Sequence, residues 1–501
     1  MKVQCAILAV ALAAIGCATG ETLEGDSGPT YVGVDGVWIQ QVAIYQSLKR
    51  VLAEGGVPAV SNVPLVAGRD AVVRVFYAAA PEKIGTVVRG RLEITGHESL
   101  IVEGALVGQS FDHDMASTFN FGVPGDAISE PFEYRVSLLH EAEDDNVTAH
   151  HPAAGRESHF VEGPRNTLRV ILAPFQYNAD GSGRLPDTSP AMVELYRQRL
   201  LALYPVSNVE VTVREPYPWS QPIGNWGEGW DSVQWALYSF RDQDGTSADV
   251  YYYGIFNPAD TFEQYCQGGC ILGLTWMYEG PPDVGTPDMR MALGIGYPEV
   301  APDTTAHELG HVHGRHHAPC GPGMDPNSID PAFPYANGGI GVWGLDTVTL
   351  ELKDPTKEPS AYGLDPGPSD MMAYCSNEWV SDYTYAGLLF RGKNVNLPDI
   401  QGANGRPIQR PQPARVDHEL ILIDGQGRGD WKRSVKRQAV GPAGSIPVSL
   451  RTLDGQTIQA RGHYYRYDHL PGGWLFFPKP AVSVNRAELS VDGRPVAVER
   501  R

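Results

Sequence analysis

The segment from Thr304 to Cys320, TTAHELGHVHGRHHAPC, constrains the fold more than any other part of the chain. His307 and His311 are four residues apart, so on a helix both imidazole rings lie on the same face. Two imidazoles placed in this way can bind one tetrahedral zinc ion. Glu308 is rotated by about 100° around the helix axis, where its carboxylate cannot readily join as a ligand but can reach a water on the metal. The segment therefore predicts a helix that carries a metal site and a general base.

A third ligand is expected from the residues that follow this helix. Gly314 tolerates the left-handed conformation that ends a helix and turns the chain sharply. The chain then returns with His317, which we predict to be the third zinc ligand, with His316 as its rival. His313 falls on the far side of the helix and is not expected to bind. The alternatives are a patch of surface histidines and a site that binds metal without catalysis.

The complete pattern H-E-x-x-H-x-x-G-x-x-H, residues 307–317, resembles the zinc signature of the metzincin clan of metallopeptidases. That clan carries a methionine turn below the zinc, and the segment SDMMAYC, residues 369–375, resembles such a turn. Met372 is a better candidate for its methionine than Met371, because Tyr374 then follows at the two-residue spacing of several metzincins. A role as a plain core methionine is compatible with this one.

The resemblance covers roughly residues 165–393 and implies a zinc endopeptidase. It implies that Glu308 is the general base and that Tyr374 steadies the oxyanion of the tetrahedral intermediate. One catalytic zinc ion would keep its fourth position for water. Its three ligands would be His307, His311 and His317.

Within the clan, this combination of motifs resembles that of bacterial secreted and lipoprotein peptidases near the StcE-like mucin-degrading group. This implies a protein or glycoprotein substrate. Ala318 departs from the residue that marks the better-known metzincin branches, and the interval from His317 to Met372 is long, which indicates distinctive substrate loops. Metzincin topology also implies an edge strand that pairs with the substrate backbone, for which Leu272–Trp276 is the candidate.

Length and residue pattern predict several domains, because 501 residues are too many for one compact core. Alternating apolar runs predict all-β, sandwich-like domains at both ends, with one short helix at 42–53 in the first. Between them, alternating strands and helices predict an α/β (α+β) catalytic domain with a mixed sheet and the active-site helix. The predicted segments are 24–163, 165–393, a proline-rich linker at 394–417, and 418–501.

Residues 1–17 resemble an export signal. The apolar run from Val3 to Ile15 is too short to span a bilayer and fits a secretory signal peptide. Small residues before Cys17 resemble a bacterial lipoprotein signal, in which that cysteine is acylated, although Ala14 replaces the usual leucine. An ordinary signal peptide cleaved nearby is the alternative. We therefore expect an exported protein that is secreted or held in the cell envelope, with a lipid anchor as its single membrane contact.

Four further cysteines remain after the signal, and an even number in an exported chain indicates disulfides. Cys266 and Cys270 can close the small loop CQGGC, which leaves Cys320 to pair with Cys375. Free buried thiols and a zinc site made of all four cysteines are the alternatives.

Charge and motif also define the rival functions. The formal net charge of −20 argues against a nucleic-acid partner, which needs a basic face. One rival is an exported binding or adhesion protein whose zinc site is structural or inactive. Another is a gluzincin-type hydrolase with a downstream glutamate as third ligand, for which Glu351 is the candidate. That alternative leaves Gly314 and His317 unexplained.

Overall fold

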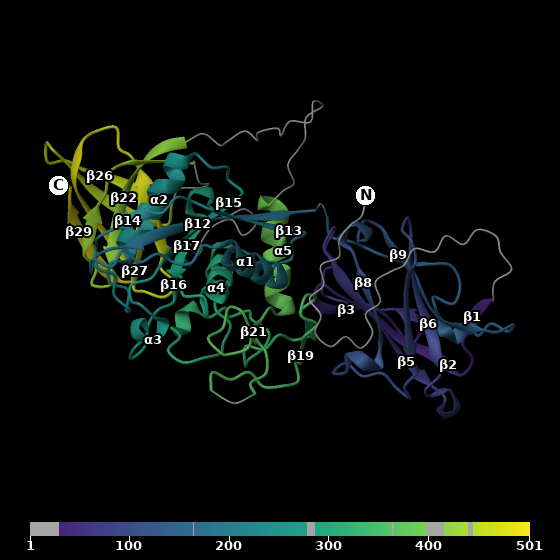
Figure 1. Ribbon diagram of the computed structural model, residues 1–501. Helices are drawn as coiled ribbons and strands as arrows, with labels where there is room; N and C mark the ends of the chain where they lie inside the picture. The colour runs from purple at the N-terminus through teal and green to yellow at the C-terminus, as the bar shows by residue number, and fades with distance from the viewer. Residues whose placement is uncertain are drawn as a thin grey trace.

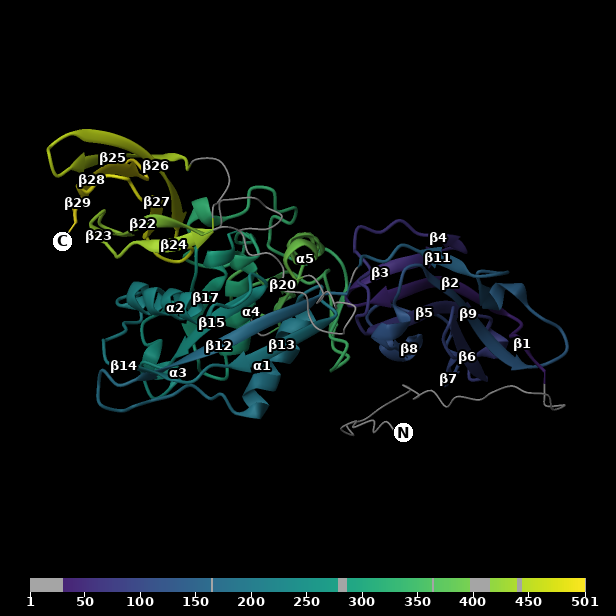
Figure 2. The ribbon, with the colours of Figure 1, turned by 90° about the horizontal axis from the view of Figure 1, so that it is seen from above.

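The computed structural model describes residues 30–163, 165–277, 286–362, 365–396, 415–438 and 444–500. The predicted signal peptide with Cys17, and most of the predicted linker, lie outside these ranges. A β-rich region at each end flanks a mixed α/β region (Figures 1 and 2). Within the described ranges, no helix is both long and apolar enough to cross a membrane.

The N-terminal region consists of two sheets that enclose one hydrophobic core. One has the order β1-β9-β6-β7, and the other has the order β19-β18-β3-β2-β5-β8. The short strands β18 and β19 come from the middle of the chain, and β18 pairs with β3. The strands are β1 Tyr31–Gly33, β2 Val37–Tyr45, β3 Ser47–Glu54, β4 Val57–Pro58, β5 Ala71–Ala79, β6 Val87–Ile94, β7 Leu100–Ala105, β8 Phe119–Val123, β9 Phe132–Glu141, β10 His150–His151, β11 Glu157–His159, β18 Gly344–Leu345 and β19 Leu352–Lys353.

The helix predicted at 42–53 is wrong, because these residues form the paired strands β2 and β3. The run from Val42 to Tyr45 is buried on both faces, so the period-two alternation of a strand is missing from it. Val42 and Ile44 enter the core between the two sheets, whereas Ala43 and Tyr45 enter a second cluster on the other face. Ser47 has a positive φ of 103°, and the chain reverses there.

The middle region is built on a mixed sheet in the order β13-β12-β15-β17-β16. Its strands are parallel except β16, which runs antiparallel to β17 at the edge. The predicted edge strand at 272–276 is thus shorter, with β16 limited to Gly273–Leu274. The elements are β12 Thr167–Tyr177, α1 Pro190–Leu203, β13 Asn208–Val213, β14 Tyr217–Trp219, α2 Trp230–Asp244, β15 Val250–Phe256, α3 Phe262–Tyr265, β17 Met291–Ile295, α4 Ala301–Val312, β20 Ser369–Asp370, β21 Glu378–Trp379 and α5 Asp382–Val395.

The C-terminal region is one curved sheet in the order β23-β22-β27-β26-β25-β28-β29. Its end strands β23 and β29 contact each other, so it forms a near-closed barrel rather than the predicted sandwich. The strands are β22 Arg415–Asp424, β23 Gly429–Trp431, β24 Val435–Gln438, β25 Ile446–Thr452, β26 Thr457–Arg466, β27 Gly472–Pro478, β28 Val484–Val491 and β29 Arg494–Glu499.

The C-terminal barrel and the middle region share one hydrophobic core. In β22, Ile421 and Ile423 face the barrel interior, whereas Leu420 and Leu422 join the core of the middle region. Trp474 of β27 is fully buried there, and its ring centroid lies 4.9 Å from that of Trp276. The two regions are therefore joined by apolar burial rather than by surface contact alone.

This shared core predicts the effect of Trp474→Ala. Removing a fully buried indole should lower the free energy of unfolding by about 3–5 kcal/mol, and the middle region and the barrel should still unfold together. Urea denaturation followed by fluorescence would measure this, with Trp38→Ala on the exposed side of β2 as the control. An unchanged midpoint for Trp474→Ala would contradict the shared core.

Candidate metal centre

Helix α4 holds the first two histidines of the cluster. It starts directly after β17 and packs against both β17 and α1, so most of its side chains are buried. His307 and His311 lie one turn apart on one face of the helix, and both are buried. His313 lies on the other side, where its ring stacks on Tyr251 at 4.7 Å. Its nitrogens are not among the converging ligand atoms of the described residues.

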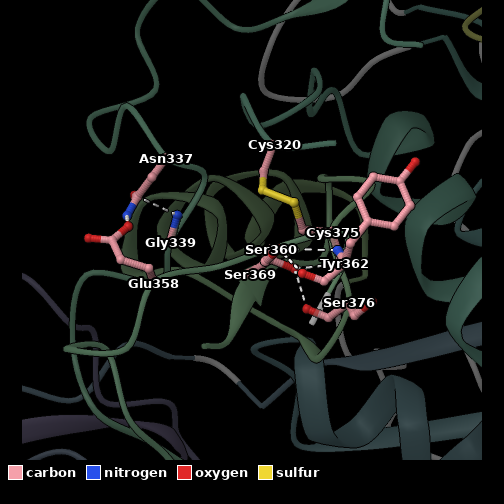
Figure 3. Close-up of a disulfide and its surroundings, with 9 residues drawn as sticks. All are labelled: Cys320, Asn337, Gly339, Glu358, Ser360, Tyr362, Ser369, Cys375 and Ser376. Carbon is pink, nitrogen blue, oxygen red and sulfur yellow. Dashed lines mark hydrogen bonds between the residues drawn. A yellow bond between two sulfur atoms is a disulfide. The ribbon is translucent and has the colours of Figure 1, made fainter. Parts of the chain in front are cut away.

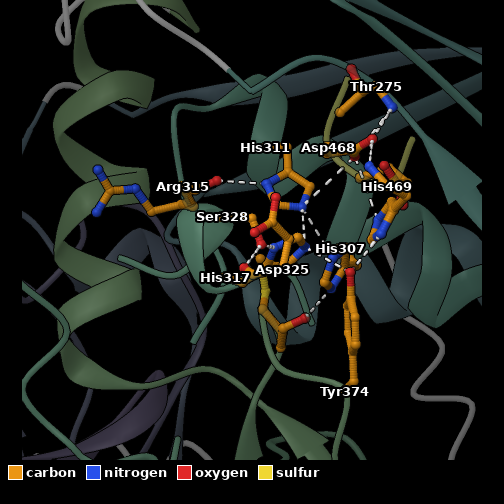
Figure 4. A network of polar contacts seen from close by, with 12 residues as sticks. Thr275, His307, His311, Arg315, His317, Asp325, Ser328, Tyr374, Asp468 and His469 are labelled. Carbon is orange, nitrogen blue, oxygen red and sulfur yellow. Dashed lines mark hydrogen bonds and ion pairs between the residues drawn. The ribbon is translucent and has the colours of Figure 1, made fainter. Parts of the chain in front are cut away.

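Gly314 ends the helix and redirects the chain. Its φ of 82° lies in the left-handed region that favours glycine. The following segment returns to the helix, and His317 is held there by a hydrogen bond from its backbone N–H to Ser328 O at 3.1 Å. The Nε2 atom of His311 lies 3.1 Å from that of His307 and 3.0 Å from that of His317 (Figure 4).

The hydrogen-bond partners of the Nδ1 atoms, which point away from the centre of the cluster, define where His307 and His311 carry their protons. His307 Nδ1 is 2.7 Å from Met371 O, and His311 Nδ1 is 2.7 Å from Arg315 O. A carbonyl oxygen only accepts hydrogen bonds, so both Nδ1 atoms are the protonated ones. Each neutral ring then presents an unprotonated Nε2 to the centre of the cluster.

The third histidine is oriented in the same way through a hydroxyl group. His317 Nδ1 lies 2.8 Å from Ser328 Oγ. That hydroxyl donates to Asp325 O at 2.7 Å, so it must accept from His317. His317 therefore also directs an unprotonated Nε2 inward.

The histidines are held in their neutral forms. Burial, and to a smaller extent the neighbouring His469, lowers the pKa of His307 to about 3. Burial also lowers the pKa of His311 and of His317 below the usual range, and the neighbouring histidines add to the effect. Neutral imidazole is the form that binds a metal ion.

The Nε2 atom of His311 lies about 3 Å from those of His307 and His317, but these unprotonated atoms cannot hydrogen-bond to one another, because none has a proton to donate. A cation among them would satisfy all three lone pairs. Zinc–nitrogen bonds of about 2.0–2.1 Å would place the nitrogens of a tetrahedral site about 3.3–3.4 Å apart, close to the observed spacing. The cluster thus fits a metal ion and resembles the zinc motif H-E-x-x-H.

Glu308 lies beside the cluster and is only 1 % exposed. Its Oε1 atom is 3.1 Å from His469 Nε2, and burial raises the pKa of its carboxyl to about 8. Gly273 of β16 makes room for this side chain, because a Cβ atom there would lie 2.3 Å from Oε1. The carboxylate therefore sits between the edge strand and the three histidines.

The methionine turn packs directly beneath helix α4. A Cβ atom on Gly310 would lie 2.4 Å from the Met372 sulfur and 3.1 Å from Met371 Cε, so glycine permits this close approach. Both methionines are buried. Tyr374 follows the turn, and its hydroxyl lies 3.1 Å from His317 Nε2. The structure thus places Met372 against Gly310 of helix α4 and Tyr374 next to His317.

The structure contains both predicted disulfides. Cys320 is bonded to Cys375 (Figure 3), and Cys266 is bonded to Cys270. The Cys320–Cys375 disulfide joins the segment after His317 to the methionine turn, and Tyr374 N–H also donates to Cys320 O there at 2.7 Å. Disulfides are typical of proteins outside the cytoplasm.

Two residues of the site were not predicted from the sequence. Asp468 and His469 lie between β26 and β27, and both enter the cluster from the C-terminal barrel (Figure 4). His469 Nε2 contacts Glu308, and its Nδ1 lies 2.5 Å from the Tyr374 hydroxyl. No spacing relates them to the histidine segment more than 150 residues earlier, so only the tertiary fold reveals them.

The cluster opens into a cleft of about 1100 Å³ between the middle region and the barrel. One wall includes Gly273, Glu308 and Tyr374, and the other includes Arg466, His469 and Asp492. The C-terminal barrel therefore forms one wall of the cleft and is part of the site.

The two rival ligands do not join the cluster. His316 lines the cleft, but its nitrogens are not among the converging ligand atoms of the described residues. Glu351, the gluzincin alternative, lies between β18 and β19, where its side chain is 63 % exposed and accepts from Lys353 at 2.7 Å. The geometry therefore supports His317 over both.

Comparisons with known proteins add little to this geometry. No protein-family model and no curated protein matches the sequence significantly. Among solved structures, metalloproteinase-II from Bacteroides fragilis is distantly similar, with 12 % identity and a TM-score of 0.21 over 52 % of this chain and 76 % of that one. A chain of a chaperone–substrate complex is similar with 11 % identity and a TM-score of 0.21, and the match covers 55 % of this chain and 40 % of that chain. Scores of this size do not establish a shared fold, so the functional argument depends on the site.

The role of Ser328 predicts a loss of metal affinity in Ser328→Ala. Without the hydroxyl, His317 loses the acceptor that fixes its tautomer, and zinc should bind roughly 10–100-fold more weakly. Competition with a coloured chelator would measure this, with Ser449→Ala on β25 as the control. Equal zinc affinity in both variants would show that Ser328 does not orient the ligand.

Proposed function

We propose that this protein is an exported zinc endopeptidase of the metzincin type that hydrolyses peptide bonds in extracellular proteins. The observation that carries the proposal is the convergence of three neutral, unprotonated Nε2 atoms next to a buried carboxylate. Three imidazole ligands also suit copper, iron and nickel, but the H-E-x-x-H arrangement with an adjacent glutamate is typical of catalytic zinc.

The proposed mechanism assigns the proton transfers to Glu308. Zinc held by His307, His311 and His317 would supply Lewis acidity, polarising a carbonyl and lowering the pKa of water toward about 7. Glu308 takes a proton from the water that attacks the carbonyl carbon of the peptide bond. It then passes this proton to the leaving nitrogen as the C–N bond breaks, so the carboxylate is regenerated.

Tyr374 is proposed to stabilise the oxyanion of the tetrahedral intermediate. Burial raises the pKa of its phenol above the usual range, so the hydroxyl keeps its proton and can donate it in a hydrogen bond. Its position 3.1 Å from His317 Nε2 supports this role. Met372 would support the floor of the site under Gly310.

The substrate is proposed to be a protein or glycoprotein that pairs with the edge of the sheet at β16. Pairing through the backbone places a peptide with little regard to its sequence, and Gly273 on this strand lies against Glu308. The resemblance to the StcE-like group favours mucin-type glycoproteins. Anchoring of the mature chain through a lipid on Cys17 completes the proposal of a cell-envelope peptidase.

The decisive variant is Glu308→Gln, which removes the proton acceptor but preserves the shape of the side chain. It should retain one zinc per chain and lose activity by roughly 10²–10⁴-fold. Metal analysis and cleavage of a panel of proteins and mucin-type glycoproteins, with and without a chelator, would measure both effects.

Glu299→Gln, which lines the same cleft, is the matched control and should retain activity. Equal cleavage by wild type and Glu308→Gln would contradict the role of Glu308 as the general base. One zinc per chain with no cleavage by either protein would favour an exported binding protein with a structural zinc site.

A further inference from the structure

His469 links the two side chains that carry the proposed chemistry. Its Nε2 lies 3.1 Å from Glu308 Oε1. Its Nδ1 lies 2.5 Å from the Tyr374 hydroxyl (Figure 4). In the ionised form in which Glu308 acts as the general base, its carboxylate only accepts hydrogen bonds, so Nε2–H of His469 donates to it. In the protein without substrate, the neutral ring then accepts the Tyr374 proton at Nδ1, and one tautomer satisfies both contacts.

The same contacts argue against His469 as a fourth metal ligand. Nε2 carries the proton that it donates to Glu308, and the lone pair of Nδ1 is directed at the Tyr374 hydroxyl. Neither nitrogen has a lone pair left for a metal ion. The centre therefore keeps a position for water and substrate.

Asp468 fixes the backbone that presents His469. Its side chain is fully buried, and its two oxygens accept from Thr275 N–H at 3.0 and 3.2 Å. The adjoining segments pair as an antiparallel bridge, because Met277 N–H donates to Arg466 O at 2.8 Å and Asp468 N–H donates to Thr275 O at 3.3 Å. His469 is thus tied to the extension of the edge strand β16.

The barrel cannot withdraw this histidine easily. Tyr467, two residues before it, accepts a hydrogen bond from the fully buried Trp474 at 2.7 Å. Both side chains belong to the core that the barrel shares with the middle region. Removing His469 from the cleft would expose that core, which argues against a detachable inhibitory segment.

From these contacts we infer that His469 is a positioning residue of the reaction centre. It holds the Glu308 carboxylate at one ring nitrogen and the Tyr374 hydroxyl at the other, so the C-terminal barrel is a required part of the catalytic unit. The inference rests on the proposed peptidase function and adds to it a residue outside the metzincin-like segment. The barrel is then no mere spacer or accessory binding domain.

The hydrogen bonds can be tested without turnover, by nuclear magnetic resonance of zinc-loaded protein labelled with nitrogen-15 histidine. His469→Gln identifies the His469 signals by their loss. Glu308→Gln should shift Nε2 of His469, and Tyr374→Phe should shift its Nδ1. The signals of His463, on β26 outside the cleft, should stay unchanged. Unmoved His469 signals in both variants would overturn the inference, whether or not the protein cleaves peptides.

Kinetics of His469→Ala give the second test. Turnover (kcat) should fall about 10–100-fold, with KM within about twofold and one zinc per chain retained. His469→Gln, which offers both a donor and an acceptor, should recover part of the loss, and His463→Ala should behave as wild type. A kcat for His469→Ala within twofold of wild type would overturn the inference while leaving the peptidase proposal intact.

Discussion

The structure of the site depends on one electrostatic constraint, which is the repulsion among three inward-facing imidazole lone pairs. Their outer nitrogens donate to two backbone carbonyls and to the Ser328 hydroxyl, so the rings cannot turn their protons inward. Burial in turn prevents protonation. Such a cluster is unfavourable in a folded interior unless a cation occupies it. Folding and metal binding are therefore expected to be coupled in this chain.

The elements around the cluster each restrain one side of it. Helix α4 sets the spacing of the first two rings, and Gly314 lets the chain turn back with the third. The methionine turn supports the helix from below, while the Cys320–Cys375 disulfide ties that turn to the segment after His317. The C-terminal barrel closes the remaining side through His469. A site assembled from such distant parts of the chain needs a rigid shared core, and the apolar contacts of Trp474 supply part of it.

The sequence predicted the features that depend on local periodicity or on a short motif. The i, i+4 histidines and the left-handed Gly314 could be placed from spacing, and the methionine turn from the resemblance to the metzincin clan. Residues 42–53 were predicted as a helix because burial on both faces hides the period of a strand. The barrel was predicted as a sandwich because strand order and closure depend on long-range pairing. Asp468 and His469 were missed for the same reason, since their role arises only when the barrel docks on the cleft.

Zinc K-edge X-ray absorption on the purified protein would test the central claim most directly. The account predicts one zinc per chain with nitrogen or oxygen neighbours at about 2.0–2.1 Å, the outer-shell scattering of three imidazole rings, and no sulfur ligand. The imidazole contribution should fall by one third in His317→Ala. Sulfur neighbours at about 2.3 Å, or a folded protein that binds no metal, would contradict the three-histidine centre.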